Sequence, residues 1–427
     1  MNDGFLVGAA EIDITPPVGT ALAGSLRPRI SEGIEDPLTV KAVVLESGGT
    51  KLAYVLLDLV KLYRKEGDAA VAAASERTGI PAGNIVWAAS HTHTGPYTGP
   101  IFGAEEGGVD KEWLASVPLK FAAAVKTAHD NRRPARMSMQ RGFCYRVGHN
   151  RRFRLKDGRA INTWNLARVP DDVQCLGTAG PIDPEIGILC FDDQDGIPIA
   201  VLWHYTLHTN TNFGKYFSAD YPAVVGARLR ERFGPATVPL FMPGACADIN
   251  CACAGRRYRV VGDILADEIL ARLANRKPCA EAPRLKARKA EVVVPYRDFT
   301  ADQEERIRAS GWPEDVLDVF RSEIEIMRRE GVTEARTIVQ AWRIGDVGFV
   351  SLPGELFVEW GLRIKRESPF PWTFPVELGG DYVGYLVTHE AWEAGGYESL
   401  TCRSARVSVE GVTRMVDTAI AELSDLW

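Results

Sequence analysis

The sequence of 427 residues has few cysteines and no long uninterrupted run of apolar residues. Eight cysteines are too sparse for a disulfide scaffold in a chain of this length. No stretch approaches the roughly 18 apolar residues that cross a bilayer, so we expect neither a transmembrane helix nor a membrane partner. No basic segment precedes an apolar stretch at the start of the chain, which is unlike a signal peptide and favours a cytoplasmic location.

Positive charge is not in excess either. The formal net charge is -6 at pH 7, which argues against binding of nucleic acid through a broad basic surface. Hydrophobic residues make up 46% of the chain and charged residues 25%, as in globular proteins with a large core. We therefore expect a folded protein that acts on a small molecule, and the composition leaves a homo-oligomer open.

Three of the cysteines, Cys246, Cys251 and Cys253, lie close together. Their spacing, C-x4-C-x-C, lacks the second well-spaced pair of a zinc knuckle. Small buried thiols in a tight loop explain the cluster better than a structural metal site does.

Apolar runs rich in β-branched residues alternate along the chain with amphipathic helical patterns. The expected strands are 53–57, 84–89, 186–191, 197–203 and 347–352. The expected helices are 68–77, 112–129, 221–233, 260–273, 301–329, 353–366 and 409–423. This interleaving predicts one α/β domain over residues 1–427, with a large mixed central sheet flanked by helices. The charged segment 301–333 is the best candidate for a helical excursion, either a lid or interface or a solvated helical pair.

Histidine is scarce, and four of the seven histidines lie in two clusters at strand ends. His91 and His93 follow the run at 84–89, and residues two apart in an extended chain point the same way. His204 and His208 follow a second apolar run. Neutral imidazole is a common zinc ligand, so the pattern predicts metal binding or catalysis, with hydrogen-bonded loop histidines as the alternative. His204 is better interpreted as a packed or supporting residue than as a ligand.

A carboxylate and several tyrosines complete the candidate site. Glu355 follows a strand and a Pro-Gly turn, where the pattern predicts the first turn of a helix and a carboxylate favoured by the helix dipole. Simple helix capping is the alternative for Glu355. Tyrosines and glycines gather in the segment 381–398, where the phenols line a cavity or lie in a surface turn.

Several short motifs resemble, in order, the catalytic domain of the neutral/alkaline non-lysosomal ceramidase family. Among them are Ser-His-Thr-His-Thr-Gly-Pro at 90–96, Pro-Gly-Glu at 353–355 and Gly-Tyr-Leu-Val-Thr at 384–388. The others lie at 8–19, 207–209 and 218–221, so the resemblance covers nearly the whole chain. In that family one zinc ion, held by two histidines, a glutamate and a tyrosine, activates water to cleave an N-acyl amide.

The resemblance implies a role for each matching residue. The implied zinc ligands, for one zinc ion per chain, are His91, His208, Glu355 and Tyr385. His93 would face the substrate and stabilise the oxyanion, Tyr397 would contact the substrate, and Arg151 would be the substrate-binding arginine. Asp248 and Asp220 are candidates for orienting the ligand imidazoles or taking a proton.

The sequence departs from the family in two places. Asn250 replaces the family serine implicated in ceramide cleavage, which leaves Asn250 a hydrogen-bonding role towards substrate and excludes a serine nucleophile. The chain also ends soon after the catalytic region, without room for the C-terminal immunoglobulin-like domain of the secreted ceramidases. Ceramide is therefore not the expected substrate.

The function expected from the sequence is zinc-dependent hydrolysis of a small soluble amide, of the N-acyl amine or amino-sugar type, by metal-activated water. An ester or lactone hydrolase and a zinc-dependent lyase are the alternatives among enzymes. A catalytically silent ligand-binding protein is the alternative outside them.

Overall fold

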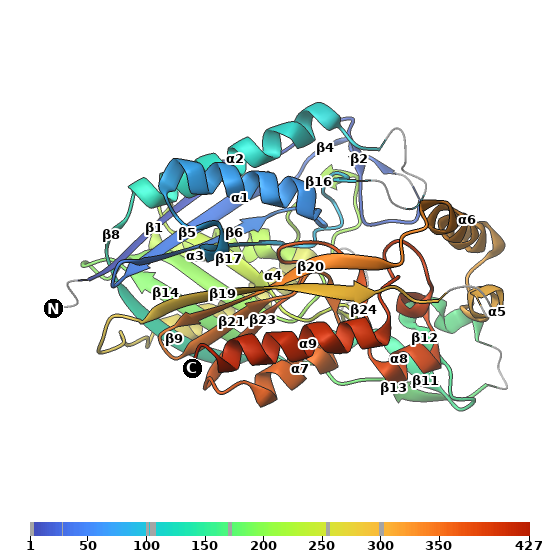
Figure 1. The fold of residues 1–427 in the computed structure, drawn as a ribbon. Helices are drawn as coiled ribbons and strands as arrows, with labels where there is room; N and C mark the ends of the chain where they lie inside the picture. The colour runs from blue at the N-terminus through green and yellow to red at the C-terminus, as the bar shows by residue number, and fades with distance from the viewer. Residues whose placement is uncertain are drawn as a thin grey trace.

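Three larger β-sheets form the centre of the computed structural model, which describes residues 4–27, 29–99, 102, 108–169, 173–252, 257–298 and 303–427 (Figure 1). The first sheet has the order β7 (Ile85–Ala89), β6 (Thr50–Leu57), β5 (Thr39–Ser47), β1 (Phe5–Asp13) and β8 (Arg133–Pro134). The second has the order β17 (Val238–Pro243), β15 (Pro198–Tyr205), β14 (Glu185–Asp192) and β9 (Arg136–Phe143). The third has the order β19 (Leu285–Pro295), β20 (Glu334–Ile344), β21 (Val347–Ser351) and β23 (Trp372–Val376).

Smaller elements surround these sheets. Four short pairs or triplets are β2 (Ala21–Leu22) with β3 (Arg29–Ile30), β4 (Gly33–Ile34) with β16 (Tyr216–Phe217), β10 (Gly148–Asn150) with β18 (Ile249–Cys251), and β11 (Arg152–Leu155) with β12 (Ala160–Asn162) and β13 (Cys175–Thr178). A fifth is β22 (Glu355–Leu356) with β24 (Tyr385–Leu386). The α-helix α8 (His389–Ala394) and three 3-10 turns, η1 (Ala82–Asn84), η2 (Thr163–Arg168) and η3 (Tyr397–Ser399), lie in the connections.

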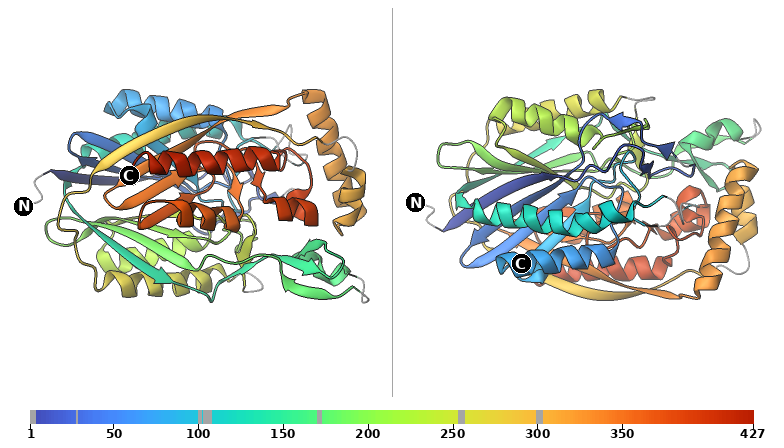
Figure 2. Two further views of the ribbon diagram at one scale, coloured as in Figure 1. Left: turned by 60° about the horizontal axis from the view of Figure 1, so that its bottom comes forward. Right: turned by 90° about the horizontal axis from the view of Figure 1, so that it is seen from above.

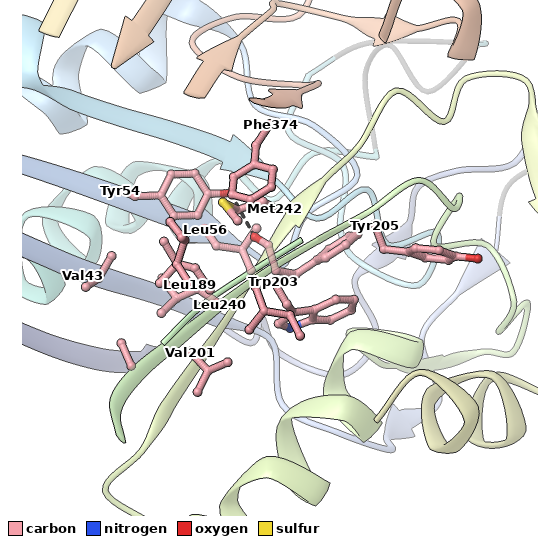
Figure 3. Close-up of a cluster of buried hydrophobic side chains, with 14 of the residues drawn as sticks. Val43, Tyr54, Leu56, Leu189, Val201, Trp203, Tyr205, Leu240, Met242 and Phe374 are labelled. Atoms are coloured by element: carbon pink, nitrogen blue, oxygen red, sulfur yellow. Dashed lines mark hydrogen bonds between the residues drawn. The ribbon is translucent and has the colours of Figure 1, made fainter. Parts of the chain in front are cut away.

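Three strands of the first sheet, β5, β6 and β7, are buried on both faces along most of their length. Along β6, Tyr54 and Leu56 point into the core shared with the other two sheets, whereas Val55 and Leu57 point into a second core. Because side chains alternate between the faces of a strand, burial on both sides requires the continuous apolar runs seen in the sequence. In the shared core, the hydroxyl of Tyr54 donates a hydrogen bond to the carbonyl of Phe241 at 2.9 Å (Figure 3).

Helices cover the outer faces of the sheets (Figures 1 and 2). α1 (Arg64–Thr78) and α2 (Lys111–Asp130) pack together, and α2 lies over the first sheet. α3 (Tyr221–Phe233) and α4 (Tyr258–Leu273) pack on the second sheet, and α7 (Val358–Glu367) and α9 (Val409–Ser424) on the third. The predicted α/β class is confirmed, with the strands divided among several sheets, some of them mixed. Within the described ranges, no helix has both the length and the apolar character to cross a membrane.

The helix expected over 301–329 is two helices instead of one. α5 (Gln303–Ala309) and α6 (Glu314–Glu330) are separated by a link that contains Gly311, with a φ of +77°, and Pro313; residues 301 and 302 lie outside the described part. A left-handed glycine followed by proline interrupts helical hydrogen bonding. Both helices lie at one end of the molecule, beside α8 and β11–β13 (Figures 1 and 2).

The helix expected over 353–366 begins later, at Val358. Glu355 belongs to the strand β22, which runs parallel to β24 with Glu355 opposite Tyr385, and its amide N–H donates to the carbonyl of Gly384 at 3.0 Å. The prediction that Glu355 lies in the first turn of a helix was therefore wrong, because its backbone pairs with a strand 30 residues later in the sequence.

Candidate metal centre

The candidate site lies beyond the carboxyl ends of three pairs of parallel strands, one pair in each large sheet: β6 with β7, β15 with β17, and β21 with β23. His91 and His93 follow β7, His208 follows β15, and Glu355 follows β21. Loops at the carboxyl ends of parallel strands commonly carry the ligand sites of α/β proteins. The same topological position in three sheets thus brings together residues that are more than 200 positions apart.

Three histidines form the centre of this site. The ligand nitrogens of His91, His93 and His208 all lie within 4.8 Å of one another, with His93 the most exposed of the three. The Nδ1 atom of each ring lies 2.6 to 3.2 Å from a backbone carbonyl, those of Val60, Gly24 and Cys246 respectively. Because a carbonyl can only accept, each Nδ1 carries a proton, and a ring that is neutral presents the lone pair of Nε2.

These lone pairs converge without donors between them. Nε2 of His93 lies 3.1 Å from Nε2 of His208, although neither nitrogen carries a proton in this tautomer. Two acceptors at that distance are unfavourable unless a proton or a metal cation lies beside them. Burial, and then the charge of His91, hold the pKa values of His93 and His208 well below the ordinary value, so the neutral form is favoured.

Glu355 faces the histidines with one of its two oxygens. Its Oε2 atom lies 3.3 Å from Nε2 of His91, and both atoms are buried with no other partner in the described residues. Its Oε1 atom accepts a 2.8 Å hydrogen bond from the hydroxyl of Tyr382. Burial alone would raise the pKa of Glu355, but His91 and hydrogen bonds that include Tyr385 and Tyr382 lower it to about 2.

This donor set fits zinc. Nitrogen and carboxylate oxygen are preferred zinc ligands, and a positive ion is what the opposed Nε2 and Oε2 atoms lack. Burial lowers the pKa of His91, but the nearby carboxylate of Glu355 contributes most to the opposite shift, and the pKa is raised overall. The raised pKa shows that Glu355 favours positive charge at this place. The orphaned pair of atoms therefore supports a bound cation.

The phenol of Tyr385 lies beside Glu355 and is held from the other side. The hydroxyl of Tyr385 accepts a hydrogen bond from Nη2 of Arg151 at 3.3 Å. Arg151 also donates to Oδ1 of Asn250 at 3.3 Å and to Oε1 of Glu398 at 2.7 Å. The structure thus joins Tyr385, Arg151 and Asn250 in one network, and the buried Glu398 compensates the arginine charge. The ring of Tyr397 lies 5.7 Å from that of Tyr385.

The two aspartates do not orient the imidazoles. Asp248 accepts hydrogen bonds from the side chain of Asn150 at 2.6 Å and from the amide of Val358 at 2.9 Å. Asp220 accepts from the amide of Asn212 at 2.8 Å and so shapes the loop after His208. The expectation that these carboxylates orient the ligand histidines was wrong, because the Nδ1–H groups donate hydrogen bonds to backbone carbonyls instead. A proton-transfer role for Asp248 stays a prediction.

His204 and the cysteines belong to the packing around the site. His204 stacks on Phe374, and its Nε2 donates to the carbonyl of Pro375 at 2.9 Å, which confirms it as a packed residue. Cys246 is buried and its thiol donates to Oε1 of Glu377 at 2.9 Å, as expected of a small structural thiol. Cys251 is half-buried in β18, and Cys253 lies outside the described residues.

Two residues behind the ligands, Lys61 and Glu377, were not predicted from the sequence, and Tyr382 was predicted only as one of the phenols that line a cavity or lie in a surface turn. Tyr382 supports Glu355, and the ammonium of Lys61 lies 4.1 Å from the centre of the Tyr382 ring. Glu377 is fully buried and accepts from the amides of Cys246 and Leu356 at 3.1 and 2.9 Å. A lone acid after an apolar strand carries no recognisable motif, so only the fold identifies Glu377.

The arrangement defines a class: an α/β protein with a candidate metal centre where parallel strands end. No family model and no curated protein matches the sequence. Among solved structures, the chain is similar to neutral ceramidase from Pseudomonas aeruginosa, with a TM-score of 0.73 and 18% identity. It is also similar to a ceramidase complexed with C2, with a TM-score of 0.75 and 16% identity. Each likeness covers 99% of this chain and 75% of the other. The predicted ceramidase-like fold is confirmed.

Proposed function

We propose that the protein is a zinc-dependent hydrolase that cleaves a small soluble amide. The observation that carries the proposal is the convergence of the ring nitrogens of His91, His93 and His208, with Oε2 of Glu355 3.3 Å from Nε2 of His91. The ceramidase-like fold supports an amide as the bond cleaved, because the similar proteins are named as ceramidases.

His91, His208, Glu355 and Tyr385 would hold one zinc ion. A zinc ion there would supply a Lewis acid that polarises a carbonyl and activates water. Arg151, itself held by Glu398, donates a hydrogen bond to the phenol of Tyr385. Tyr382 donates a hydrogen bond to the carboxylate of Glu355. Asn250 accepts from Arg151 and from Asn210, and no serine stands there to act as a nucleophile.

His93 suits proton transfer. Its Nδ1–H donates a hydrogen bond to the carbonyl of Gly24, so Nε2 of the neutral ring has a lone pair with which to accept a proton. In the proposed reaction Nε2 takes one proton from the attacking water, and the new N–H then donates to the oxyanion or returns the proton to the leaving amine. The oxyanion role inferred from the resemblance thus follows proton uptake rather than preceding it.

Zinc content and turnover test this proposal. The purified protein should carry one zinc per chain and should hydrolyse at least one compound in a library of soluble amides, esters and lactones. His91→Ala and Glu355→Ala should abolish turnover, whereas His129→Ala, at the end of α2, should retain it. Zinc far below one per chain, or full activity in both ligand variants, would refute the assignment.

The choice of bond is decided by the same library. Turnover of esters or lactones without turnover of amides would favour the runner-up hydrolase, and zinc binding without any turnover would favour a silent binding protein. A cytoplasmic location, a homo-oligomer and the absence of nucleic-acid and membrane partners stay predictions from the sequence.

A further inference from the structure

Three aromatic rings from distant segments meet next to the proposed metal centre. Trp164 comes from η2, Trp312 from the link between α5 and α6, and Tyr397 from η3. Their ring centres form a triangle with sides of 5.9, 6.1 and 6.2 Å. We call these three residues the aromatic wall. Tyr397 connects the wall to Tyr385, whose ring centre lies 5.7 Å away.

The aromatic wall lies at the edge of a hydrophobic cluster, against which Trp312 and Tyr397 pack. The Trp164 side chain is 38% exposed, and Trp312 and Tyr397 are only half-buried. The indole N–H of Trp312 is buried and has no hydrogen-bond partner. An unpaired buried donor is rare because it costs free energy, so it indicates an acceptor that the protein itself does not supply.

Charged groups are interleaved with the rings. The guanidinium of Arg151 lies 5.3 Å from the centre of the Trp164 ring, and that of Arg168 lies 6.0 Å from the Trp312 ring. Asn250 and Asn210 hydrogen-bond next to Arg151. The surface beside the metal centre therefore combines aromatic faces with several polar groups.

This combination selects against an alkyl chain. A chain of methylene groups would lie against the Trp312 side of the wall without supplying an acceptor for its indole N–H, which is unfavourable. A sugar ring has an apolar face that packs on indole and hydroxyl groups that pair with N–H donors and amides. The groups beside Tyr385 match the second description.

We propose that the aromatic wall is the subsite for the sugar ring of an N-acylated amino sugar. This inference rests on the proposed hydrolase function, since the subsite would place the acylamino group of the sugar beside Tyr385. Trp164 and Trp312 would select the substrate class by contacting the sugar ring. Neither of them belongs to the proposed metal ligands.

Binding of two simple probes tests the subsite without turnover. The methyl glycoside of N-acetylglucosamine and N-hexylacetamide share an acetamide group but differ in the ring. Calorimetry and tryptophan fluorescence on the zinc-loaded protein should show the glycoside bound at least tenfold more tightly. Equal affinity, tighter binding of the alkyl amide, or no binding of the glycoside would overturn the proposal.

Variants assign the effect to the wall. Trp164→Ala should raise the Kd of the glycoside at least tenfold, and Trp312→Phe should raise it while preserving the packing of the link between α5 and α6. Trp427→Ala, which removes a 54% exposed indole at the C-terminus, should leave it unchanged. An unchanged Kd in both wall variants overturns the subsite.

Kinetics separate this inference from the proposed function. For an amino-sugar amide, Trp164→Ala should raise KM and leave kcat nearly unchanged. Hydrolysis of alkyl amides in preference to sugar amides would leave the hydrolase standing and remove the subsite. Sugar binding that depends on the aromatic wall, without hydrolysis of any amide, would support the subsite and refute the proposed hydrolase.

Discussion

The geometry of single residues explains why the candidate metal centre is pre-organised. His91 has a φ of 68°, a left-handed conformation that costs a non-glycine residue roughly 1–3 kcal/mol. Its amide donates to the carbonyl of Leu59 and its Nδ1 to the carbonyl of Val60, both beyond the end of β6. These two contacts fix backbone and ring together, so Nε2 is aimed before any ion binds.

His93 tests how the three histidines divide their roles. We expect His93→Ala to reduce zinc affinity by less than tenfold, because His93 is not one of the four proposed ligands. Glu355 lies against His91 instead, and His93 is the most exposed of the three histidines. Turnover should fall at least a hundredfold, since proton transfer of this kind contributes about 10²–10⁴-fold. Chelator competition measures the first effect and steady-state kinetics the second. A loss of zinc affinity as large as that of His91→Ala would make His93 a ligand.

Glu377 provides a second test, from behind the ligands. It holds the amide of Cys246, whose carbonyl orients His208, and the amide of Leu356, next to Glu355. Both amides donate to Oε2 of Glu377, and Oε1 accepts from the Cys246 thiol, so Glu377→Gln places an NH2 group against either the thiol or the two amides. We expect zinc affinity to fall about 10- to 100-fold, as for other residues that support metal ligands.

Chelator competition measures this loss directly, with Glu334→Gln at the exposed start of β20 as the matched control. Zinc affinity that is equal in the wild-type protein and in Glu377→Gln would contradict the supporting role.

Among the elements, the small pair β22–β24 matters more to the site than its length suggests. It places Glu355 opposite Tyr385 across a parallel register. Gly354 makes this close approach feasible, because a Cβ atom there would lie 2.4 Å from the carbonyl oxygen of Gly384. The register of this pair, rather than a helix, therefore sets the geometry of two proposed ligands.

Gly354→Ala should separate the two short strands. The clash is with backbone, which cannot rotate away, so we expect a loss of about 1–3 kcal/mol in stability and weaker zinc binding. Thermal unfolding and chelator competition measure the two effects. Gly83→Ala is the matched control, because its added methyl group meets open space. Equal behaviour of the two variants would show that the strand pair is dispensable.

For the whole molecule, the sequence predicts elements better than their assembly. The runs at 84–89 and 347–352 are strands, since burial on both faces leaves a continuous apolar signal. Which strands pair, and that they form three sheets, depends on contacts far apart in sequence that no local pattern encodes. His91 and His93 stood out by spacing, whereas Tyr385 needed the family resemblance and Glu377 needed the fold.

The stability of the whole chain should depend on the buried carboxyl group of Asp248 and its half-buried neighbour Glu359. Burial, and then the neighbouring Glu359, raise the pKa of Asp248 to about 8, and burial raises that of Glu359. An unfolded aspartate releases its proton near pH 4. Between these values the folded state binds the extra proton, so the free energy of unfolding falls as the pH rises from about 4 to about 8.

Asp248→Asn removes that proton and should flatten the fall by up to about 1.4 kcal/mol per pH unit. Denaturant unfolding at pH 5 and pH 8, in the presence of a chelator, measures the difference. Asp195→Asn, in the exposed turn between β14 and β15, should follow the wild-type protein. If Asp248→Asn lost as much stability across this range as the wild-type protein, Asp248 would be ionised in the fold, held as a carboxylate by Asn150 and the amide of Val358.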